Sequence, residues 1–434
     1  MWWEVPGHLE VREHGLYVGG LDAENLARDV GTPLYVYDLG GVAANFRRFR
    51  DAVTKYADRE VGIHYAMKAN PNKEILKALR AEGACLDCVS PEEVRLGLKA
   101  GFSEEDIIFT GVSVSNSDMR SVLKKKRYQP TINIDSFSQL RRLRQICDED
   151  GYNPLFVPIS FRMNPGTGGV GQSWKTITAG PYVFHGDEKT PVKFGIPADE
   201  IQRAYEEAVE LGFYPDGLSE HVGSNWRTGE QVAEFLKTVD ILLEKAGEIE
   251  KYLKEMRGLG LEFIDFGGGP GIRYKEEHPE FPLDMYAREI WERVKKSGLT
   301  AKKILFEPGR FVVGNAGVYL VEVNTVEDKH GYNFVGVNGG MGQFPRPAMY
   351  EAPHEAIVCG NADGKPEVET VVAGNCCETG DLLTRDPVIR DMPEIEEGDI
   401  VAFLNAGAYC FSMASNYNSR SKPKEIAVLD GCIV

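Results

Sequence analysis

Residues 61–82, Val61-Gly-Ile-His-Tyr-Ala-Met-Lys-Ala-Asn-Pro-Asn-Lys-Glu-Ile-Leu-Lys-Ala-Leu-Arg-Ala-Glu82, place an apolar run and an amphipathic segment in direct succession. The run Val61–Met67 is typical of a buried strand, and Asn72–Glu82 carries apolar residues at helical spacing. Lys68 stands where the strand ends. A strand followed at once by a helix predicts strands that pair in parallel.

The same alternation of strand-like and helix-like segments recurs from about residue 45 to residue 310. Further strand-like runs are Ile107–Thr110, Thr131–Ile134, Leu155–Phe161, Ile264–Phe266 and Ile304–Phe306, and further helical stretches are Pro91–Ala100 and Asp199–Leu211. Residues of types that often act in catalysis or ligand binding directly follow several of the strands: Lys68, Asp87, Arg162, His221, Gly267 and Glu307. A site ringed by strand ends favours an α/β fold with an eight-stranded β/α (TIM-like) barrel over residues 45–310. Spacing alone leaves a doubly wound sheet open.

The pattern changes after Arg310, where helical segments become scarce. The strand-like runs there are Val312–Thr325, Val335–Asn338, Glu367–Ala373, Asp399–Leu404 and Glu425–Leu429. Leu9–Gly19 also has the pattern of a strand pair, and we expect it to join the same unit. The sequence therefore predicts a second, mostly β domain made of residues 1–44 and 311–434.

Composition excludes several classes of function. The 434 residues include 66 acidic and 49 basic side chains, a formal net charge of −17, which disfavours binding to nucleic acid or to a membrane surface. No apolar run approaches the roughly 18–20 residues that span a bilayer. The amino terminus lacks the pattern of a secretory signal, so we expect a cytoplasmic protein.

The eight cysteines fit a reducing compartment. Cys85 and Cys88 form one CxxC pair with no second pair at metal-ligand spacing, so we expect no metal site.

Four short motifs suggest chemistry, and each also has a structural explanation. Lys68 is either a lysine extended along a strand end or a desolvated amine able to form a Schiff base. His221 either caps a strand or lies against a flat aromatic ligand, while Ser224 offers a hydroxyl to an anion. Asp265-Phe-Gly-Gly-Gly-Pro-Gly271 is either a plain loop or a set of amides around a phosphate, and it does not match the dinucleotide fingerprint. Glu307-Pro-Gly-Arg310 is either a surface ion pair or a partner for a pyridine nitrogen with an arginine left for an anion.

Together the four motifs supply an amine for an aldehyde, a stacking ring, a phosphate loop and a charge partner for a ring nitrogen. These are the requirements of pyridoxal 5'-phosphate, so we expect this cofactor.

The motifs resemble those of the fold-type III pyridoxal-phosphate decarboxylases, within them most closely the diaminopimelate decarboxylases, over about Thr32 to Asp430. The matching segments are Tyr65-Ala-Met-Lys68-Ala-Asn70, Asp87-x-x-Ser90-x-x-Glu93, His221-Val-Gly-Ser224, Gly267-Gly-Gly269, Glu307-Pro-Gly-Arg310, Arg346-Pro-Ala-Met-Tyr350, Cys377-Glu378-Thr-Gly-Asp381, and Gly407-Ala-Tyr409 leading to Ser415–Arg420.

The resemblance implies a role for each of these positions. Lys68 would form the Schiff base and His221 would stack on the ring, with Glu307 at the pyridine nitrogen. The other cofactor contacts would come from Gly223, Ser224, Gly267, Gly268, Gly269, Gly309, Arg310 and Tyr409. Cys377 would return a proton to the α-carbon, and Cys377 and Glu378 would reach into the site of a partner subunit in a homodimer. The second domain would then carry substrate and dimer contacts.

The expected substrate follows from the far end of the site. Arg310, Arg346, Tyr350 and Glu378, with Tyr409, would hold a second amino-acid head group, with cations for its carboxylate and an anion for its ammonium. We therefore expect a carboxy-lyase that converts meso-2,6-diaminopimelate to L-lysine and carbon dioxide, the last step of lysine biosynthesis. The alternatives are a related decarboxylase of another D- or L-diamino acid and a non-catalytic cofactor-binding homologue. Two segments depart from the family pattern: 167–191, with an apparent insertion at 181–191, and 338–343.

Overall fold

The computed structural model describes residues 1–123, 129–166 and 193–434, so the apparent insertion at 181–191 lies outside the described residues. The chain divides into two compact units. The barrel unit contains Arg47–Gly271 and Phe281–Gly309, and the β unit contains Met1–Phe46, Ile272–Glu280 and Arg310–Val434. The segment Ile272–Glu280 falls inside the range expected for the barrel, yet it belongs to the β unit.

Eight parallel strands form a closed ring in the barrel unit. They are β5 (Glu60–Ala66), β6 (Cys85–Cys88), β7 (Ile107–Phe109), β8 (Thr131–Ile134), β9 (Ile159–Asn164), β11 (Pro215–Ser219), β12 (Phe263–Asp265) and β13 (Lys303–Phe306). Closure follows from two pairings, β8 with β9 and β13 with β5, which leave neither end of the sheet open. The eight-stranded β/α barrel is confirmed, and the doubly wound alternative is wrong. A two-residue strand, β10 (Ile196–Pro197), pairs with β9.

The helices of the barrel unit begin at the polar residues that the sequence places before them. Asn72 caps α3 (Lys73–Ala81) by accepting from Glu74 N, and Ser90 caps α4 (Pro91–Lys99) by accepting from Glu93 N. The Glu93 side chain accepts in turn from Val89 N at 2.7 Å. Such caps are worth about 1 kcal/mol each. Part of the Asp87-x-x-Ser90-x-x-Glu93 motif is therefore a helix start.

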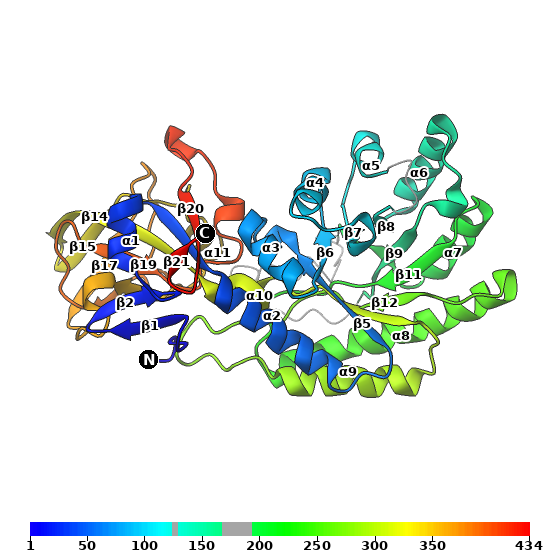
Figure 1. Cartoon of the computed structure of the whole chain (residues 1–434), viewed down its shortest axis with the longest axis horizontal. Coiled ribbons are helices and arrows are strands. Elements are labelled where there is room, and N and C mark those ends of the chain that lie inside the picture. Colours follow the sequence, from blue (N-terminus) through cyan, green and yellow to red (C-terminus); the bar gives the residue numbers. More distant parts are fainter. Residues whose placement is uncertain (124–128, 167–192) are drawn as a thin grey trace. The chain divides into compact units, whose positions relative to one another are not determined.

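Further helices alternate with the strands around the ring (Figure 1). They are α2 (Leu39–Thr54), which crosses the boundary between the units, α5 (Asn116–Val122), α6 (Phe137–Asp150), α7 (Ile201–Glu210), α8 (Gly229–Arg257) and α9 (Leu283–Ser297). Within the described ranges, no helix has both the length and the apolar composition that crossing a bilayer requires.

The expected strand Leu155–Phe161 is only partly right. Pro154–Phe156 form a 3-10 turn instead, capped by Asn153, whose side chain accepts from Leu155 N. Proline has no N–H to give to a sheet, so β9 begins only after this turn, at Ile159.

The β unit contains a branched sheet and, apart from it, a small sheet of N-terminal strands. The strand order is β18 (Arg390–Met392), β17 (Val368–Ala373), β15 (Tyr332–Val337), β14 (Gly317–Lys329), β4 (Leu34–Asp38), β20 (Lys424–Leu429) and β21 (Cys432–Ile433). On the other branch β19 (Ile400–Phe403) pairs with β14 and with β16 (Ala356–Val358). The predicted strand Val312–Thr325 starts later than expected, because residues 310–316 form the short helix α10 (Arg310–Val313) and a 3-10 turn.

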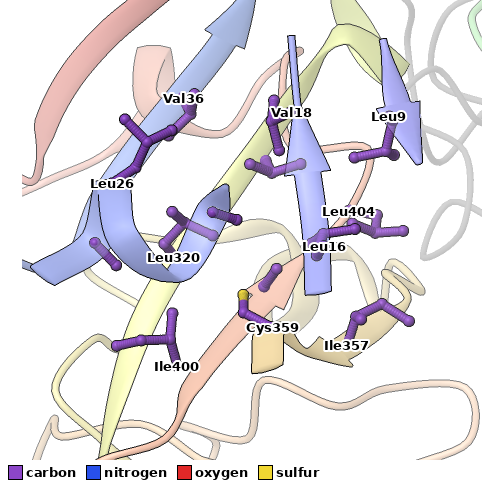
Figure 2. Packing of buried hydrophobic residues seen from close by; sticks show 14 of the residues in the cluster. Leu9, Leu16, Val18, Leu26, Val36, Leu320, Ile357, Cys359, Ile400 and Leu404 are labelled. Atoms are coloured by element: carbon purple, nitrogen blue, oxygen red, sulfur yellow. The ribbon is translucent and has the colours of Figure 1, made fainter. Parts of the chain in front are cut away.

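An N-terminal hairpin packs its apolar side chains into the hydrophobic core of the β unit. Leu9–Gly19 forms β1 (Leu9–Arg12) and β2 (Gly15–Val18), which pair antiparallel, and β3 (Leu21–Asp22) leads into α1 (Ala23–Val30). Figure 2 shows Leu16 and Val18 among side chains from other strands, including Val36 and Leu320. Burying each such side chain contributes about 1.5–3 kcal/mol. The expectation that this hairpin joins the β unit is confirmed.

Candidate active site

The first group of site residues lies at the carboxyl ends of β5 and β6. Ala66 is in register with Asp87, so Lys68, two residues further on, comes close to that carboxylate. Lys68 Nζ lies 3.2 Å from Asp87 Oδ2. Asp87 is fully buried, and its other oxygen, Oδ1, has no hydrogen-bond partner. The barrel therefore holds a partly exposed amine against a buried carboxylate.

Two buried acids lie at the ends of the neighbouring strands β12 and β13. The Asp265 and Glu307 side chains are hydrogen-bonded to each other. Burial, and next the charges of Asp265 and Asp87, raise the pKa of Glu307 well above its ordinary value. Burial also raises the pKa of Asp265 to about 7. Glu307 therefore retains a proton at neutral pH when no ligand is bound, because an ionised pair of adjacent buried carboxylates is unfavourable.

The loop after β11 brings a histidine onto the glycine segment. Gly268 N donates to His221 Nδ1 at 3.2 Å, which assigns the remaining ring proton to Nε2. Burial, followed by the charges of Lys68 and Arg162, lowers the pKa of His221 well below its ordinary value, so the ring is neutral.

The glycine segment lies too close to its neighbours for any side chain. A Cβ on Gly268 would lie 2.2 Å from Glu307 O, and one on Gly267 would lie 2.3 Å from Glu220 O. The backbone is anchored as well, since Gly267 N donates to Asp265 Oδ1 at 2.8 Å. Gly269, the last of the three glycines, packs against Trp226, whose backbone N–H donates to Gly269 O. This packing leaves peptide groups as the surface that the loop can offer to a ligand.

Two more predicted cofactor residues, Gly223 and Ser224, lie in the loop between β11 and α8. Gly223 has a positive φ of 145°, and a Cβ there would lie 2.7 Å from Trp226 Nε1. Gly309 precedes α10, in the short connection that leads from β13 to Arg310.

The β unit brings two arginines together on one tyrosine. Tyr274 Oη accepts from Arg310 Nη1 at 2.7 Å and from Arg346 Nη1 at 3.2 Å. Both guanidinium groups are buried. Arg310 also lies over the ring of Tyr409, 4.9 Å from its centroid, and Tyr409 adopts a left-handed φ of 58°. The arrangement concentrates positive charge in a buried location.

Arg346 has no carboxylate partner among the described residues. Its contacts are the Tyr274 hydroxyl, His354 Nε2 at 2.8 Å and the Cys410 sulfur. Its Nε is buried and makes no hydrogen bond. Since an uncompensated buried charge is costly, the geometry suits an anionic ligand. Tyr350 ends the same short helix, α11 (Arg346–Tyr350), and is half-buried; burial raises its pKa, against the opposing charges of Arg346 and Arg310.

Cys377 and Glu378 lie on an exposed loop of the β unit. The hydrogen bonds of this loop are made to residues other than the two arginines on Tyr274. Cys377 N donates to Asn418 Oδ1 at 2.7 Å, and Gly380 N donates to Glu378 Oε2 at 2.7 Å. Asp381 fixes the base of the loop by accepting from Cys376 N and Met341 N. The loop is thus ordered by its own hydrogen bonds, while the side chains of Cys377 and Glu378 remain accessible.

Three site residues were missed from the sequence: Asp265, Tyr274 and His354. Asp265 opens the glycine segment, and an acid at a strand end is a signal of the same kind as Glu307. Tyr274 and His354 belong to no motif that the sequence shows.

All eight cysteines are free thiols. In the described part of the chain, no cluster of three or more His, Cys, Asp or Glu side chains is arranged to bind a metal.

The barrel residues fit pyridoxal phosphate. An amine for its aldehyde, a neutral imidazole and a protonated acid pair lie within electrostatic range of one another. One buried carboxylate oxygen, Asp87 Oδ1, lacks a hydrogen-bond partner, as expected for a polar group that awaits a ligand.

Comparisons with known proteins agree with this chemistry. Residues 39–314 match the family model "Pyridoxal-dependent decarboxylase, pyridoxal binding domain". The diaminopimelate decarboxylase of Methanothermobacter thermautotrophicus is 39% identical over 428 residues, covering 98% of this chain and 93% of the relative. The diaminopimelate decarboxylase of Helicobacter pylori, solved in complex with L-lysine, is similar with a TM-score of 0.81 and 30% identity, covering 95% of each chain. That of M. jannaschii, also solved with L-lysine, has a TM-score of 0.82 and 27% identity over 97% of this chain and 92% of the other.

The similarity to curated enzymes extends over nearly the full length of the chain, and the strand-end lysine beside a buried acid and the glycine loop without side chains agree with it. The chain therefore belongs to the diaminopimelate decarboxylase family of pyridoxal-dependent decarboxylases.

Proposed function

We propose that this chain decarboxylates meso-2,6-diaminopimelate to L-lysine and carbon dioxide, as the last step of lysine biosynthesis. The observation that carries the proposal is Arg346, a buried guanidinium that has no carboxylate partner among the described residues. A substrate with a second amino-acid head group supplies the missing carboxylate. A diamine-forming substrate such as ornithine or lysine has no such group.

The cofactor contacts follow from the barrel residues. Lys68 would hold pyridoxal phosphate through its amine, and His221 would lie against the ring. The amides of Gly267, Gly268 and Gly269, with Gly223, Ser224 and Gly309, would surround the phosphate, as helix starts and glycine loops do elsewhere. Arg310 and Tyr409 would add a cation and a hydroxyl. When bound, pyridoxal phosphate supplies an electron sink that accepts the pair of electrons left when carbon dioxide departs.

The acid pair has a separate task, which is to control one proton. Glu307 is protonated because burial and Asp265 disfavour its charge. Glu307 would be placed to give that proton to the ring nitrogen of the cofactor and to remain beside it as the compensating carboxylate. Asp265 stays fixed meanwhile by Gly267 N. Together the two acids would hold one proton at the ring nitrogen.

The proton that replaces carbon dioxide on the α-carbon would come from Cys377. Its exposed thiol and the neighbouring Glu378 are accessible to another molecule, and we propose that they act in the site of a partner subunit in a homodimer. Glu378 would bind the distal ammonium group of the substrate, opposite the carboxylate on Arg346. Since all eight cysteines are free thiols, we also propose that the enzyme works in the cytoplasm.

The test is a decarboxylation screen of the holoenzyme. Carbon dioxide release is measured with meso-diaminopimelate, D-lysine, L-lysine, D-ornithine, L-ornithine and L-arginine. We expect turnover only with meso-diaminopimelate, and none with the matched Lys68→Ala variant. Turnover of ornithine or lysine at a comparable rate would contradict the substrate, and a cofactor-loaded protein that releases no carbon dioxide would contradict the activity.

Sharing of sites between subunits is tested by mixing two inactive variants. Lys68→Ala and Cys377→Ala each lose activity, but a mixed dimer has one site with both residues intact. Random reassociation is expected to restore about a quarter of the wild-type activity. A mixture that stays inactive, although sedimentation shows that mixed dimers form, would contradict sharing.

A further inference from the structure

Tyr274 bridges the two arginines of the β unit through a single oxygen atom. Its hydroxyl accepts from Arg310 Nη1 at 2.7 Å and from Arg346 Nη1 at 3.2 Å. The two guanidinium groups also lie near the face of the same ring, with their carbon atoms 5.8 Å and 4.9 Å from its centroid. Tyr274 itself is buried. One side chain therefore sets the positions of two cations.

The hydroxyl has one unused hydrogen-bonding group. A phenol has two lone pairs and one proton. The two arginines occupy both lone pairs, and none of the hydrogen bonds among the described residues uses the proton. A buried hydroxyl proton beside two cations is directed toward an anion, because no cation can accept it.

Arg346 shows a matching arrangement. One Nη1 proton goes to Tyr274 and the other goes to His354 Nε2 at 2.8 Å. His354 can accept there because its Nδ1 proton is donated to Leu404 O at 2.7 Å, which fixes the tautomer. Nη1 is thereby fully used. Nε and Nη2 remain. Nε is buried with no partner, and the Cys410 sulfur is a further contact of the guanidinium. Nη2 adjoins Nη1, so an anion that Nη2 binds on that side lies next to the Tyr274 hydroxyl.

The segment that carries Tyr274 is anchored independently of the arginines. Asn405 Nδ2 donates to Arg273 O at 3.1 Å, and Lys275 Nζ lies 2.7 Å from Asp386 Oδ2. The ring of Tyr274 also packs edge-on against His354, with centroids 5.5 Å apart. Tyr274 is therefore held in place before any ligand arrives.

We propose that Tyr274 is a further carboxylate-binding residue, whose hydroxyl spaces Arg310 and Arg346 and donates its own proton to the carboxylate that Arg346 binds. His354 is a positioning residue that acts through Arg346. The ligand class is an amino acid with a carboxylate at the end remote from the reacting carbon. The inference rests on the proposed function and adds the residue that selects for this carboxylate.

The experiment compares two ligands that differ by one carboxylate, L-lysine and cadaverine. Equilibrium dissociation constants of the holoenzyme are measured for both ligands in the wild type and in Tyr274→Phe, which removes one oxygen and keeps the ring. The matched control is Tyr319→Phe, since Tyr319 is a buried tyrosine of the same unit whose hydroxyl has no hydrogen-bond partner.

In Tyr274→Phe we expect the dissociation constant for L-lysine to rise on the order of tenfold to a hundredfold, the usual range for a hydrogen bond to a charged group. Cadaverine should bind as it does to the wild type, and the cofactor spectrum should not change. The KM for meso-diaminopimelate should rise more than kcat falls. Tyr319→Phe should leave all these quantities unchanged.

Equal weakening of both ligands in Tyr274→Phe, or no weakening of either, overturns the proposal. If Tyr274→Phe does not fold, as thermal unfolding will show, His354→Phe is put through the same comparison; it should weaken L-lysine alone, and equal effects on both ligands again overturn the proposal. Failure of the proposed function is a separate result. A wild-type holoenzyme that binds L-lysine but does not decarboxylate meso-diaminopimelate would remove the reaction while leaving the binding comparison valid.

Discussion

Asp87 Oδ2 lies 3.2 Å from Lys68 Nζ, and the carboxylate is fully buried whereas the lysine side chain is partly exposed. The acid is thus the fixed member of the pair and the amine is the movable one. A lysine that must release and recapture a cofactor needs such an arrangement, because its amine leaves and returns while its anchor stays in place.

The first prediction concerns this anchor. Asp87→Asn keeps the shape and removes the charge, so Lys68 loses its ion pair and its amine is less well positioned. We expect kcat, and the rate at which borohydride traps the cofactor on Lys68, to fall about 10- to 100-fold. The matched control is Asp284→Asn, which removes an exposed acid paired with the exposed Lys55 at 2.7 Å. Equal rates in Asp87→Asn and the wild type would refute the role of the pair.

A second prediction concerns the acid pair in the cofactor-free protein. The folded-state pKa values of Glu307 and Asp265 are raised, so the folded state binds these protons more tightly than the unfolded chain does. The stability they contribute is therefore complete below the unfolded pKa and is lost as pH rises through the folded values. Glu307→Gln should flatten the decline in the free energy of unfolding that sets in as the pH rises above about 5. Denaturant titrations at several pH values measure the slope, and Glu92→Gln, at an exposed position, should not alter it.

Glu220 provides a third prediction, again on stability. Its Oε1 accepts from Thr238 Oγ1 at 3.0 Å, its Oε2 has no partner, and burial raises its pKa to about 8. Glutamine keeps the acceptor and cannot ionise. Glu220→Gln should therefore have little effect below about pH 4.5 and should stabilise the protein increasingly as the pH rises from there to about 8. A variant that is less stable than the wild type at the higher pH would show that the ionised form has a function in the fold.

The fourth prediction tests the exposed loop. Glu378→Ala removes the proposed anion for the distal ammonium group and should raise the KM for meso-diaminopimelate, or lower turnover, by orders of magnitude. Glu378→Asp should retain part of the activity, because the charge is kept at a shorter reach. Glu394→Ala, at another exposed acid of the β unit, serves as the control. Unchanged steady-state kinetics in Glu378→Ala would remove Glu378 from the substrate site.

The barrel could be predicted because its strands and helices alternate along the chain, and local sequence determines each of them. The run Val61–Met67 agrees with β5 to within one residue at each end. Errors arose where a local feature replaced a strand, as Pro154 does before β9. Residues at strand ends could be found as well, since a barrel brings those ends together whatever their separation in sequence.

The cluster of Arg310, Arg346 and Tyr274 could be predicted only in part. Arg310 and Arg346 belong to recognisable motifs, but Tyr274 reaches them from Ile272–Glu280, a segment that leaves the barrel sequence and folds with the β unit. No pattern in the sequence indicates that this segment, which lies between two parts of the barrel along the chain, folds with the β unit. His354 likewise gains its role from Leu404 O, fifty residues away, which fixes its tautomer.

The position of β4 has a consequence for synthesis on the ribosome. Its five residues are all buried, and its sheet neighbours β14 and β20 follow only about 280 and 390 residues later in the chain. At typical elongation rates this strand waits on the order of tens of seconds for its partners. The nascent polypeptide therefore exposes an unpaired apolar edge until β14 and β20 have been synthesised, so a product that stalls before them is expected to be a client for chaperones.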